Sequence, residues 1–151
     1  MGRPVTAAAA TFRLLRAAVV AAGAATTTLA MAAQTVKHAA TQAELIAALG
    51  NDTTVVFNNT ILLESSTDVT DSHGRDLGAT GIVIENAQGF VIDGAGFAIN
   101  GRGSMRCLYV GGSGTTVEFR NLTVTNGNST GFGGGIYVEN GGTATLTTSP
   151  V

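Results

Sequence analysis

Tryptophan is absent from this 151-residue chain, cysteine occurs once, proline twice, and only 12% of the residues are charged. A single thiol cannot close an intramolecular disulfide, so packing and hydrogen bonds must hold the fold. We expect Cys107 to be a small core residue, because a nucleophilic thiol needs a base and neither histidine is near it in the sequence. Glycine occurs 21 times between apolar, β-branched runs, which predicts many tight turns rather than a helical bundle.

The first 32 residues differ in composition from the rest. They carry Arg3, Arg13 and Arg16, then an Ala/Val-rich apolar stretch, and the small-x-small pattern of residues 30–32. This order predicts a secretory signal peptide over residues 1–32, and hence a secreted or cell-surface protein; an organellar transit peptide is the alternative. The apolar run is too short and too rich in alanine for a transmembrane span.

Removal of this leader leaves five basic residues against ten acidic ones, a net charge near −5. A chain with that balance and no basic patch is not expected to bind nucleic acid. Four N-x-S/T sequons would accept glycans in a eukaryotic secretory pathway, at Asn51, Asn58, Asn121 and Asn128.

Residues 33–50 are predicted to be a linker and one short helix. Thr41 and Glu44 have the spacing of a capping box, in which each side chain accepts a hydrogen bond from the other residue's backbone N–H. Leu45, Ile46 and Leu49 then form one apolar stripe, and Gly50 is placed to end the helix.

Beyond the helix the chain repeats itself over residues 51–151. Each copy has a short apolar strand, a Gly/Asn-rich turn and a second strand. The copies are VVFNNTILL from Val55, IVIENAQGFVI from Ile82, LYVGGSGTTVEF from Leu108 and IYVENGGTATL from Ile136, with starts 27, 26 and 28 residues apart. A steady period of this length is typical of a solenoid.

Strands this short cannot bury a face alone, so each must pair in parallel with its equivalent in the next copy. Coils of this length hold about three short strands, as in a parallel β-helix. The prediction is an all-β parallel β-helix of about four coils, capped at its N-terminal edge by the short helix. Interior rows are expected at Ile82, Leu108 and Ile136, and at Ile84, Val110 and Val138. A β-sandwich of hairpins is the alternative, and the pattern stops within its fourth coil, so we expect a fragment of a longer protein.

Three stretches carry a resemblance to a known family. FVIDGAGFAING resembles the strand–turn segment of right-handed β-helix proteins of the pectin-lyase-like superfamily. FGGGIYVENGGTATLTTS is similar to the Gly-Gly-Ile repeats of polymorphic outer-membrane and related surface β-helix proteins. The helix followed by TTVVFNNTILL resembles the N-terminal cap and first coil of the same group, so the resemblance covers about residues 36–151. It implies a right-handed β-helix.

The superfamily includes polysaccharide lyases and hydrolases beside adhesins without catalytic activity. The paired-Asp, Gly-His-Gly and Arg-Ile-Lys strings of the hydrolases do not occur in this sequence. The leading hypothesis is therefore a non-catalytic adhesive, structural or carbohydrate-contacting module, whose partner is a polysaccharide or cell-surface glycan. The alternative is a fragment of a polysaccharide lyase or glycoside hydrolase.

Residues 64–81 are the strongest candidate for a site, because a connection this long is often functional. Asp68, Asp71 and Asp76 supply the oxygen ligands that Ca²⁺ prefers, although their spacing matches no known calcium loop; a solvated loop containing an unrecognised strand is the alternative.

Three arginines form a second candidate, for carbohydrate. Arg75, Arg102 and Arg106 are candidates for binding the carboxylates of acidic sugars. The simpler interpretation is scattered surface charge. Asp93, which precedes a glycine, is expected to be a turn residue rather than a catalytic acid.

Overall fold

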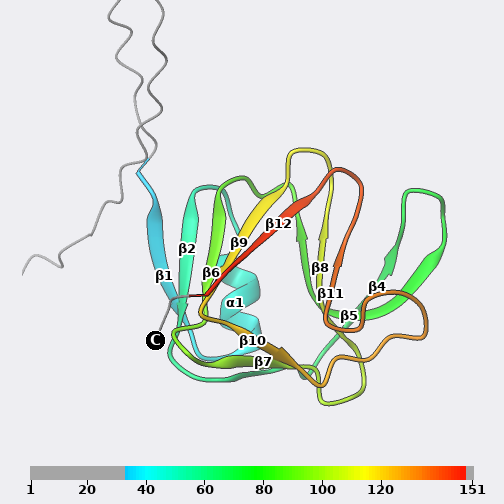
Figure 1. Ribbon diagram of the computed structural model, residues 1–151, viewed down its shortest axis with the longest axis horizontal. Helices are drawn as coiled ribbons and strands as arrows, with labels where there is room; N and C mark the ends of the chain where they lie inside the picture. The colour runs from blue at the N-terminus through cyan, green and yellow to red at the C-terminus, as the bar shows by residue number, and fades with distance from the viewer. Residues whose placement is uncertain (1–32, 149–151) are drawn as a thin grey trace, which may run out of the picture.

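The computed structural model describes residues 33–148, so the signal peptide predicted over residues 1–32 lies outside the described part of the chain. The fold is all-β with one short helix (Figure 1). In chain order the elements are β1 (Thr35–Ala39), α1 (Gln42–Ala48), β2 (Thr53–Phe57), β3 (Ile61–Leu62), β4 (Thr67–Thr70), β5 (Asp76–Glu85), β6 (Phe90–Asp93), β7 (Ala98–Asn100), β8 (Arg106–Gly111), β9 (Thr116–Arg120), β10 (Thr123–Thr125), β11 (Ile136–Val138) and β12 (Thr143–Thr147).

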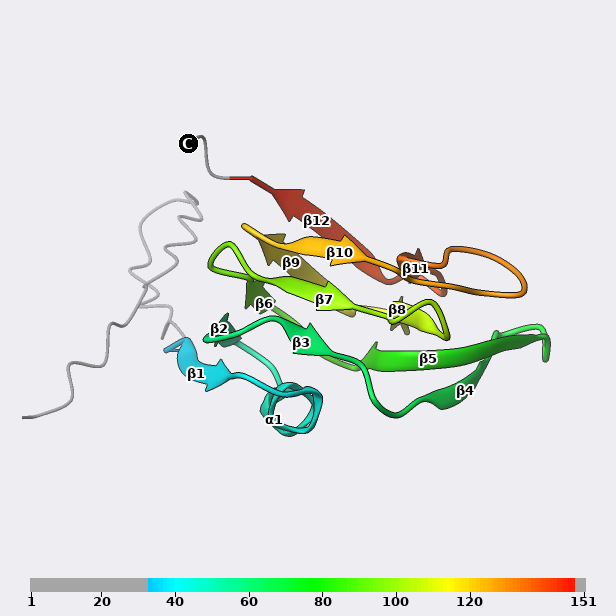
Figure 2. The ribbon, with the colours of Figure 1, turned by 90° about the horizontal axis from the view of Figure 1, so that it is seen from below.

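The strands belong to three sheets. Sheet A has the order β1-β2-β6-β9-β12, sheet B the order β10-β7-β3, and sheet C the order β11-β8-β5-β4. From β5 to β12 the chain visits sheets C, A and B in a fixed rotation, and we call each passage through the three sheets a circuit. Successive circuits lie one above another, from α1 and β1 at one end to β12 at the other (Figure 2). Every strand pair is parallel except β4 with β5.

The register of the two predicted rows is confirmed, and they are interior in β5 and β8, but the expected interior position was wrong at Val138. Ile82 pairs with Leu108 and Ile84 with Val110, and β11 continues both rows with Ile136 and Val138. The first four of these side chains are fully buried, whereas Val138, on the last circuit, is 39% exposed. Rows of stacked aliphatic side chains therefore form the core, as the period of the sequence requires.

The alignment of the first copy, from Val55, with the other three copies was wrong. Val55 pairs with Ile92 of sheet A, and Ile61 with Ile99 of sheet B, whereas Ile82 lies in sheet C. The segment from Val55 is therefore equivalent to the stretch that begins at Phe90. Both stretches are a short apolar strand, a turn and a second strand, so the hydrophobic pattern alone matched this segment to the wrong third of the circuit.

Helix α1 forms where its capping pattern predicts. Thr41 Oγ1 accepts a hydrogen bond from the Glu44 backbone N–H at 3.2 Å, but the Glu44 carboxylate accepts from Ala40 N rather than from Thr41 N. Leu45 is fully buried, while Ile46 is 44% exposed, so the expected three-residue stripe was wrong at Ile46. The helix packs against β1, which occupies the part of residues 33–50 expected to be a linker.

Cys107 is confirmed as a core residue. Its side chain has no exposed surface, and the thiol contacts the Thr125 carbonyl at 3.5 Å. Burial raises the pKa of this thiol. Gly127 lies beside it, and a Cβ on Gly127 would overlap the Gly134 carbonyl oxygen, so neighbouring circuits approach closely at this corner.

Candidate functional site

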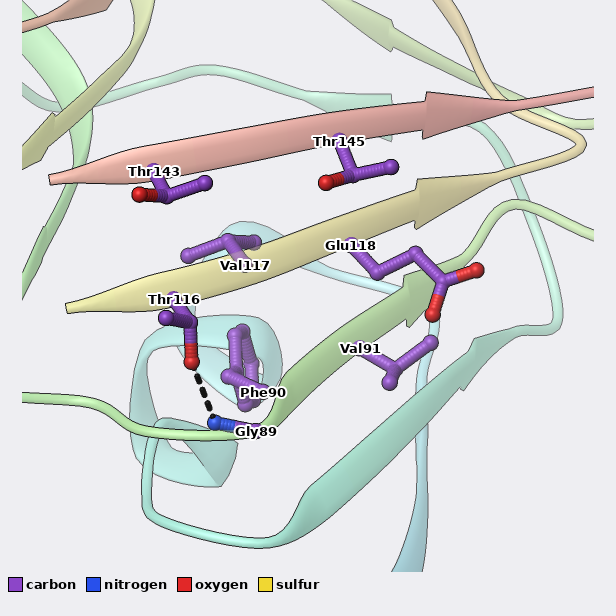
Figure 3. Close-up of a pocket in the computed structure, with 8 residues that line it drawn as sticks. All are labelled: Gly89, Phe90, Val91, Thr116, Val117, Glu118, Thr143 and Thr145. Carbon is purple, nitrogen blue, oxygen red and sulfur yellow. Dashed lines mark hydrogen bonds between the residues drawn. The ribbon is translucent and has the colours of Figure 1, made fainter.

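A shallow groove of about 330 Å³ crosses three neighbouring strands of sheet A (Figure 3). It extends from β6 over β9 to β12, and the stacked circuits place corresponding side chains next to one another along it. Its lining residues are Gly89, Phe90, Val91, Thr116, Val117, Glu118, Thr143 and Thr145.

The groove follows from strand alternation. In β9 the side chains of Val117 and Phe119 are buried, whereas Thr116 is exposed and Glu118 is partly exposed. Parallel register then sets Thr143 beside Thr116 and Thr145 beside Glu118. The outer surface of sheet A therefore presents aligned hydroxyl and carboxylate groups from successive circuits.

One end of the groove is fixed by a side chain bonded to a neighbouring backbone. The Gly89 backbone N–H donates a 2.7 Å hydrogen bond to Thr116 Oγ1 (Figure 3). Gly89 has a φ of 63°, and a Cβ there would lie 2.8 Å from Asp52 Oδ1, so glycine suits this position both conformationally and sterically.

A charged pair lies at the other end of the same strand. Arg120 donates from Nε and Nη2 to the two oxygens of Glu118, each at 2.7 Å, and this hydrogen bonding raises the pKa of Arg120. The Thr147 hydroxyl also donates to Glu118, at 3.2 Å. Glu118 is thus a fixed carboxylate with a neutralising partner, suited to accepting hydrogen bonds from a polyhydroxylated ligand.

Asp93 has the turn role expected from the sequence. Its Oδ1 accepts a 2.9 Å hydrogen bond from the backbone N–H of Ala95, a residue with a φ of 49°. Short-range bonding of this kind stabilises a tight turn.

Glu118 is the sole ionisable side chain among the residues that line the groove. Glycoside hydrolysis needs two carboxyl groups on either side of the bond that is cut.

The candidate calcium residues lie on a β-hairpin, because β4 and β5 pair antiparallel where a long loop was expected. Burial opposes ionisation of Asp71, but hydrogen bonds from the backbone and side chain of Arg75 and from the backbone of His73 lower its pKa. Asp76 accepts from the Gly78 backbone N–H, and Asp68 is exposed. Within residues 33–148 no three acidic, histidine or cysteine side chains gather closely enough to hold a metal ion. A Ca²⁺ site on these residues stays a prediction.

The three candidate arginines have different surroundings. Arg106 has no exposed surface, whereas the Arg75 side chain is 58% exposed and Arg102 lies in an exposed turn after β7 with a φ of 57°. Contacts through Phe132 and Tyr137 connect Arg75 with Arg106.

The tyrosines beside these arginines were missed in the sequence. Tyr109 and Tyr137 are register partners in sheet C, and both hydroxyls donate to Glu139, at 2.9 and 3.3 Å. Burial, and then the hydrogen bond to Glu139, raise the pKa of Tyr109 to about 12. The signal was present, because the tyrosines occupy the same position in two consecutive repeats, LYV and IYV.

The sequons lie on the surface to different degrees. Asn51, Asn58 and Asn128 are exposed, while Asn121 is partly buried and its amide lies 3.4 Å from Asp93 Oδ1. Glycosylation at these four positions stays a prediction.

Comparison with known proteins supports the pectin-lyase-like part of the resemblance. Residues 36–151 match the family described as "putative pectate lyase-like adhesive domain". The chain belongs to this pectate lyase-like adhesive domain family. No curated protein and no solved structure matches the chain. Helix α1, the one helix in residues 33–148, has seven residues and is too short to cross a membrane.

Proposed function

We propose that the protein is a secreted or cell-surface adhesive module that binds a polysaccharide through the groove on sheet A, without cleaving it. The observation that carries this proposal is the groove itself, formed by register partners from successive circuits. Neighbouring strands lie about 4.8 Å apart, so from β6 to β12 the groove spans about 10 Å. A surface that repeats along the stack suits a polymer better than a small compact ligand.

The architecture behind this proposal is a right-handed parallel β-helix. β5 and β8 are parallel neighbours in sheet C, and the chain between them passes through β6 and β7. A crossover between parallel strands of one sheet is right-handed in about 98% of cases. A crystal structure in which this connection turned to the left would contradict the assignment.

The chemistry of the groove favours a neutral or weakly charged glycan. Thr143 and Thr145 offer exposed hydroxyls, and the charge of Glu118 is offset by Arg120. Sugar hydroxyls both donate and accept hydrogen bonds, so threonine and carboxylate oxygens are suitable partners for them. The groove has one carboxyl group among its lining residues, which argues against a glycoside hydrolase fragment, since glycoside hydrolysis uses two.

Secretion and surface location are part of this proposal and depend on the leader predicted over residues 1–32. Sequencing the N-terminus of the exported protein tests them, with removal of residues 1–32 as the expected result. An N-terminus that retains the leader would contradict the secretory assignment.

Retention on immobilised polysaccharides tests the groove. We expect the wild-type chain to be retained by at least one neutral or weakly acidic polysaccharide of a plant and bacterial panel. Thr145→Val removes one hydroxyl, and loss of a hydrogen bond of about 1 kcal/mol weakens binding about fivefold. Thr67→Val makes the same change at an exposed position of β4, in sheet C, and should bind as wild type does. Equal retention of both variants would refute the groove as the binding surface.

A further inference from the structure

A second surface with binding chemistry lies away from the groove, where the β4–β5 hairpin meets the segment of residues 126–135 (Figure 1). We call Arg75, Phe132 and Tyr137 the platform. Arg75 Cζ lies 5.8 Å from the centre of the Phe132 ring, and the Phe132 and Tyr137 rings are 6.2 Å apart and inclined by 20°. Phe132 is 57% exposed, so an aromatic ring with a guanidinium over it meets solvent.

The guanidinium of Arg75 is oriented before any ligand arrives. Its Nε donates to Asp71, whose carboxylate is fully buried and also accepts 2.8 Å hydrogen bonds from the backbone N–H groups of His73 and Arg75. In the described part of the chain, the two terminal nitrogens of Arg75 have no hydrogen-bond acceptor. One edge of the guanidinium is therefore anchored, and the remaining N–H donors are available to an outside acceptor.

Arg106 holds the segment that presents Phe132. Nη2 donates to the Phe132 carbonyl at 2.7 Å, and Nε donates to the Gly133 carbonyl at 2.9 Å. The same guanidinium bonds the hydroxyls of Thr80 and Ser129 and lies 5.2 Å from the Tyr137 ring centre. No carboxylate pairs with Arg106 among residues 33–148. Its charge serves to fix backbone carbonyls, so Arg106 is a positioning residue for the Phe132 ring.

The charges around the platform limit the ligand. Asp71 offsets the charge of Arg75, and Glu139, whose carboxylate is held by the tyrosine hydroxyls, attracts Arg106 without a direct ion pair. The exposed Asp76 follows Arg75 on the hairpin, so this surface has one available guanidinium among several carboxylates. It suits a single planar anion and gives a polyanion little attraction. The exposed Phe132 ring favours an apolar face next to that anion.

We infer that the platform binds a saccharide that bears one carboxylate, with the carboxylate on Arg75 and the sugar ring on Phe132. This inference rests on the proposed carbohydrate-binding function but concerns a different surface, formed by the hairpin and by residues 126–137. Uronic acids and sialic acids both carry this chemistry. Sulfated saccharides differ because their anion is not planar.

Titration with matched saccharides, followed by chemical shifts of the Tyr137 and Phe132 rings, tests the inference. Methyl glucuronide should bind at least about tenfold more tightly than methyl glucoside, in which a hydroxymethyl group replaces the carboxylate, and its binding should shift the resonances of both rings. Comparing sialyllactose with lactose tests sialic acid, the second source of the carboxylate. Preferential binding of either charged sugar over its uncharged partner supports the inference. Equal affinities for the charged and uncharged sugars would overturn the inference, and so would a higher affinity for a sulfated disaccharide than for the carboxylated sugars.

Variants separate the platform from general stability. Arg75→Gln should lower the affinity for the charged sugar about tenfold, and Phe132→Ala should lower it about fivefold. Phe132→Ala leaves the Asp71–Arg75 pair intact. Lys37→Gln removes an exposed cation on β1, outside the platform and the groove, and should bind as wild type does. Arg106→Lys keeps the charge but loses the several N–H donors of the guanidinium that hold the Phe132 segment. It should lower the affinity for the charged sugar about tenfold, while retention of polysaccharide by the groove stays unchanged. Wild-type affinity in both Arg75→Gln and Phe132→Ala would refute the platform.

The two proposals fail separately. If polysaccharide is retained and sensitive to Thr145→Val but the charged sugars do not bind, the platform is wrong and the groove stands. If the charged sugars bind but no polysaccharide is retained through the groove, the platform stands and the groove is wrong.

Discussion

Truncation of Leu108 tests whether the stacked rows hold the fold. Leu108 is fully buried on β8, between Ile82 of the circuit below and Ile136 of the circuit above. Leu108→Ala removes apolar contacts and leaves a cavity, and buried Leu→Ala changes cost about 2.7–5.0 kcal/mol according to how far the surroundings collapse. Ile136 is only partly buried on the last circuit and is able to move toward the space. We therefore expect a loss of about 3 kcal/mol in the free energy of unfolding.

Urea unfolding followed by far-ultraviolet circular dichroism measures this loss, because the chain has no tryptophan to report by fluorescence. The matched control is Leu146→Ala on β12, the same truncation at a side chain that is 70% exposed. The control should change the free energy of unfolding by less than about 0.5 kcal/mol. Equal losses in the two variants, or a loss below about 1 kcal/mol in Leu108→Ala, would refute the assignment of Leu108 to a packed interior row.

Three further predictions concern single groups. Because the pKa of Tyr109 is raised from 10.0 to about 12, its stabilising effect is complete below pH 10 and is lost as the pH rises through about 12. Phenolate absorbance should show this late ionisation, and Glu139→Gln should move it to lower pH; an ionisation near pH 10 in the wild type would contradict the burial of the Tyr109 hydroxyl and its contact with Glu139. Gly127→Ala should lower the free energy of unfolding by about 1–3 kcal/mol, because its methyl group overlaps the Gly134 carbonyl, and an unchanged urea midpoint would show that the corner is looser. The Cys107 thiol should react with a thiol reagent only as fast as the protein unfolds, and rapid reaction of the folded chain would show that it is not in the core.

The interior of the later circuits was predictable because one physical rule determines it. Strands of three residues must stack on their equivalents, so a period of 26 to 28 residues fixed which side chains share a row, and β5, β8 and β11 follow it. The first circuit lacked that support. Its strands β2 and β3 have the same apolar pattern as β6 and β7, and the pattern does not say which sheet a strand joins.

The buried arginine illustrates what local sequence cannot supply. Charged residues are rarely fully buried, so Arg106 was expected at the surface. Its partners Thr80, Ser129, Phe132 and Gly133 lie 23 to 27 residues away in the sequence. Only the close approach of neighbouring circuits brings these groups together, and that approach is a property of the assembled fold.

The groove was missed for a related reason. Alternation in TVEFR and TATLT indicated which side chains face outward, but not which outward residues from different circuits become neighbours. That requires the register of β9 with β12, where Glu118 meets Thr145. The helix was more accessible to prediction, because Thr41 and Glu44 interact within one turn.

The most direct test of the central claim combines retention with a search for cleavage. A polysaccharide that the chain retains is incubated with it, with and without Ca²⁺, and the mixture is assayed for new reducing ends and for the ultraviolet absorbance of an unsaturated lyase product. The account predicts retention that falls in Thr145→Val, with no new chain ends under either condition. Product formation that disappears in Glu118→Gln would contradict it and would make the groove on sheet A an active site.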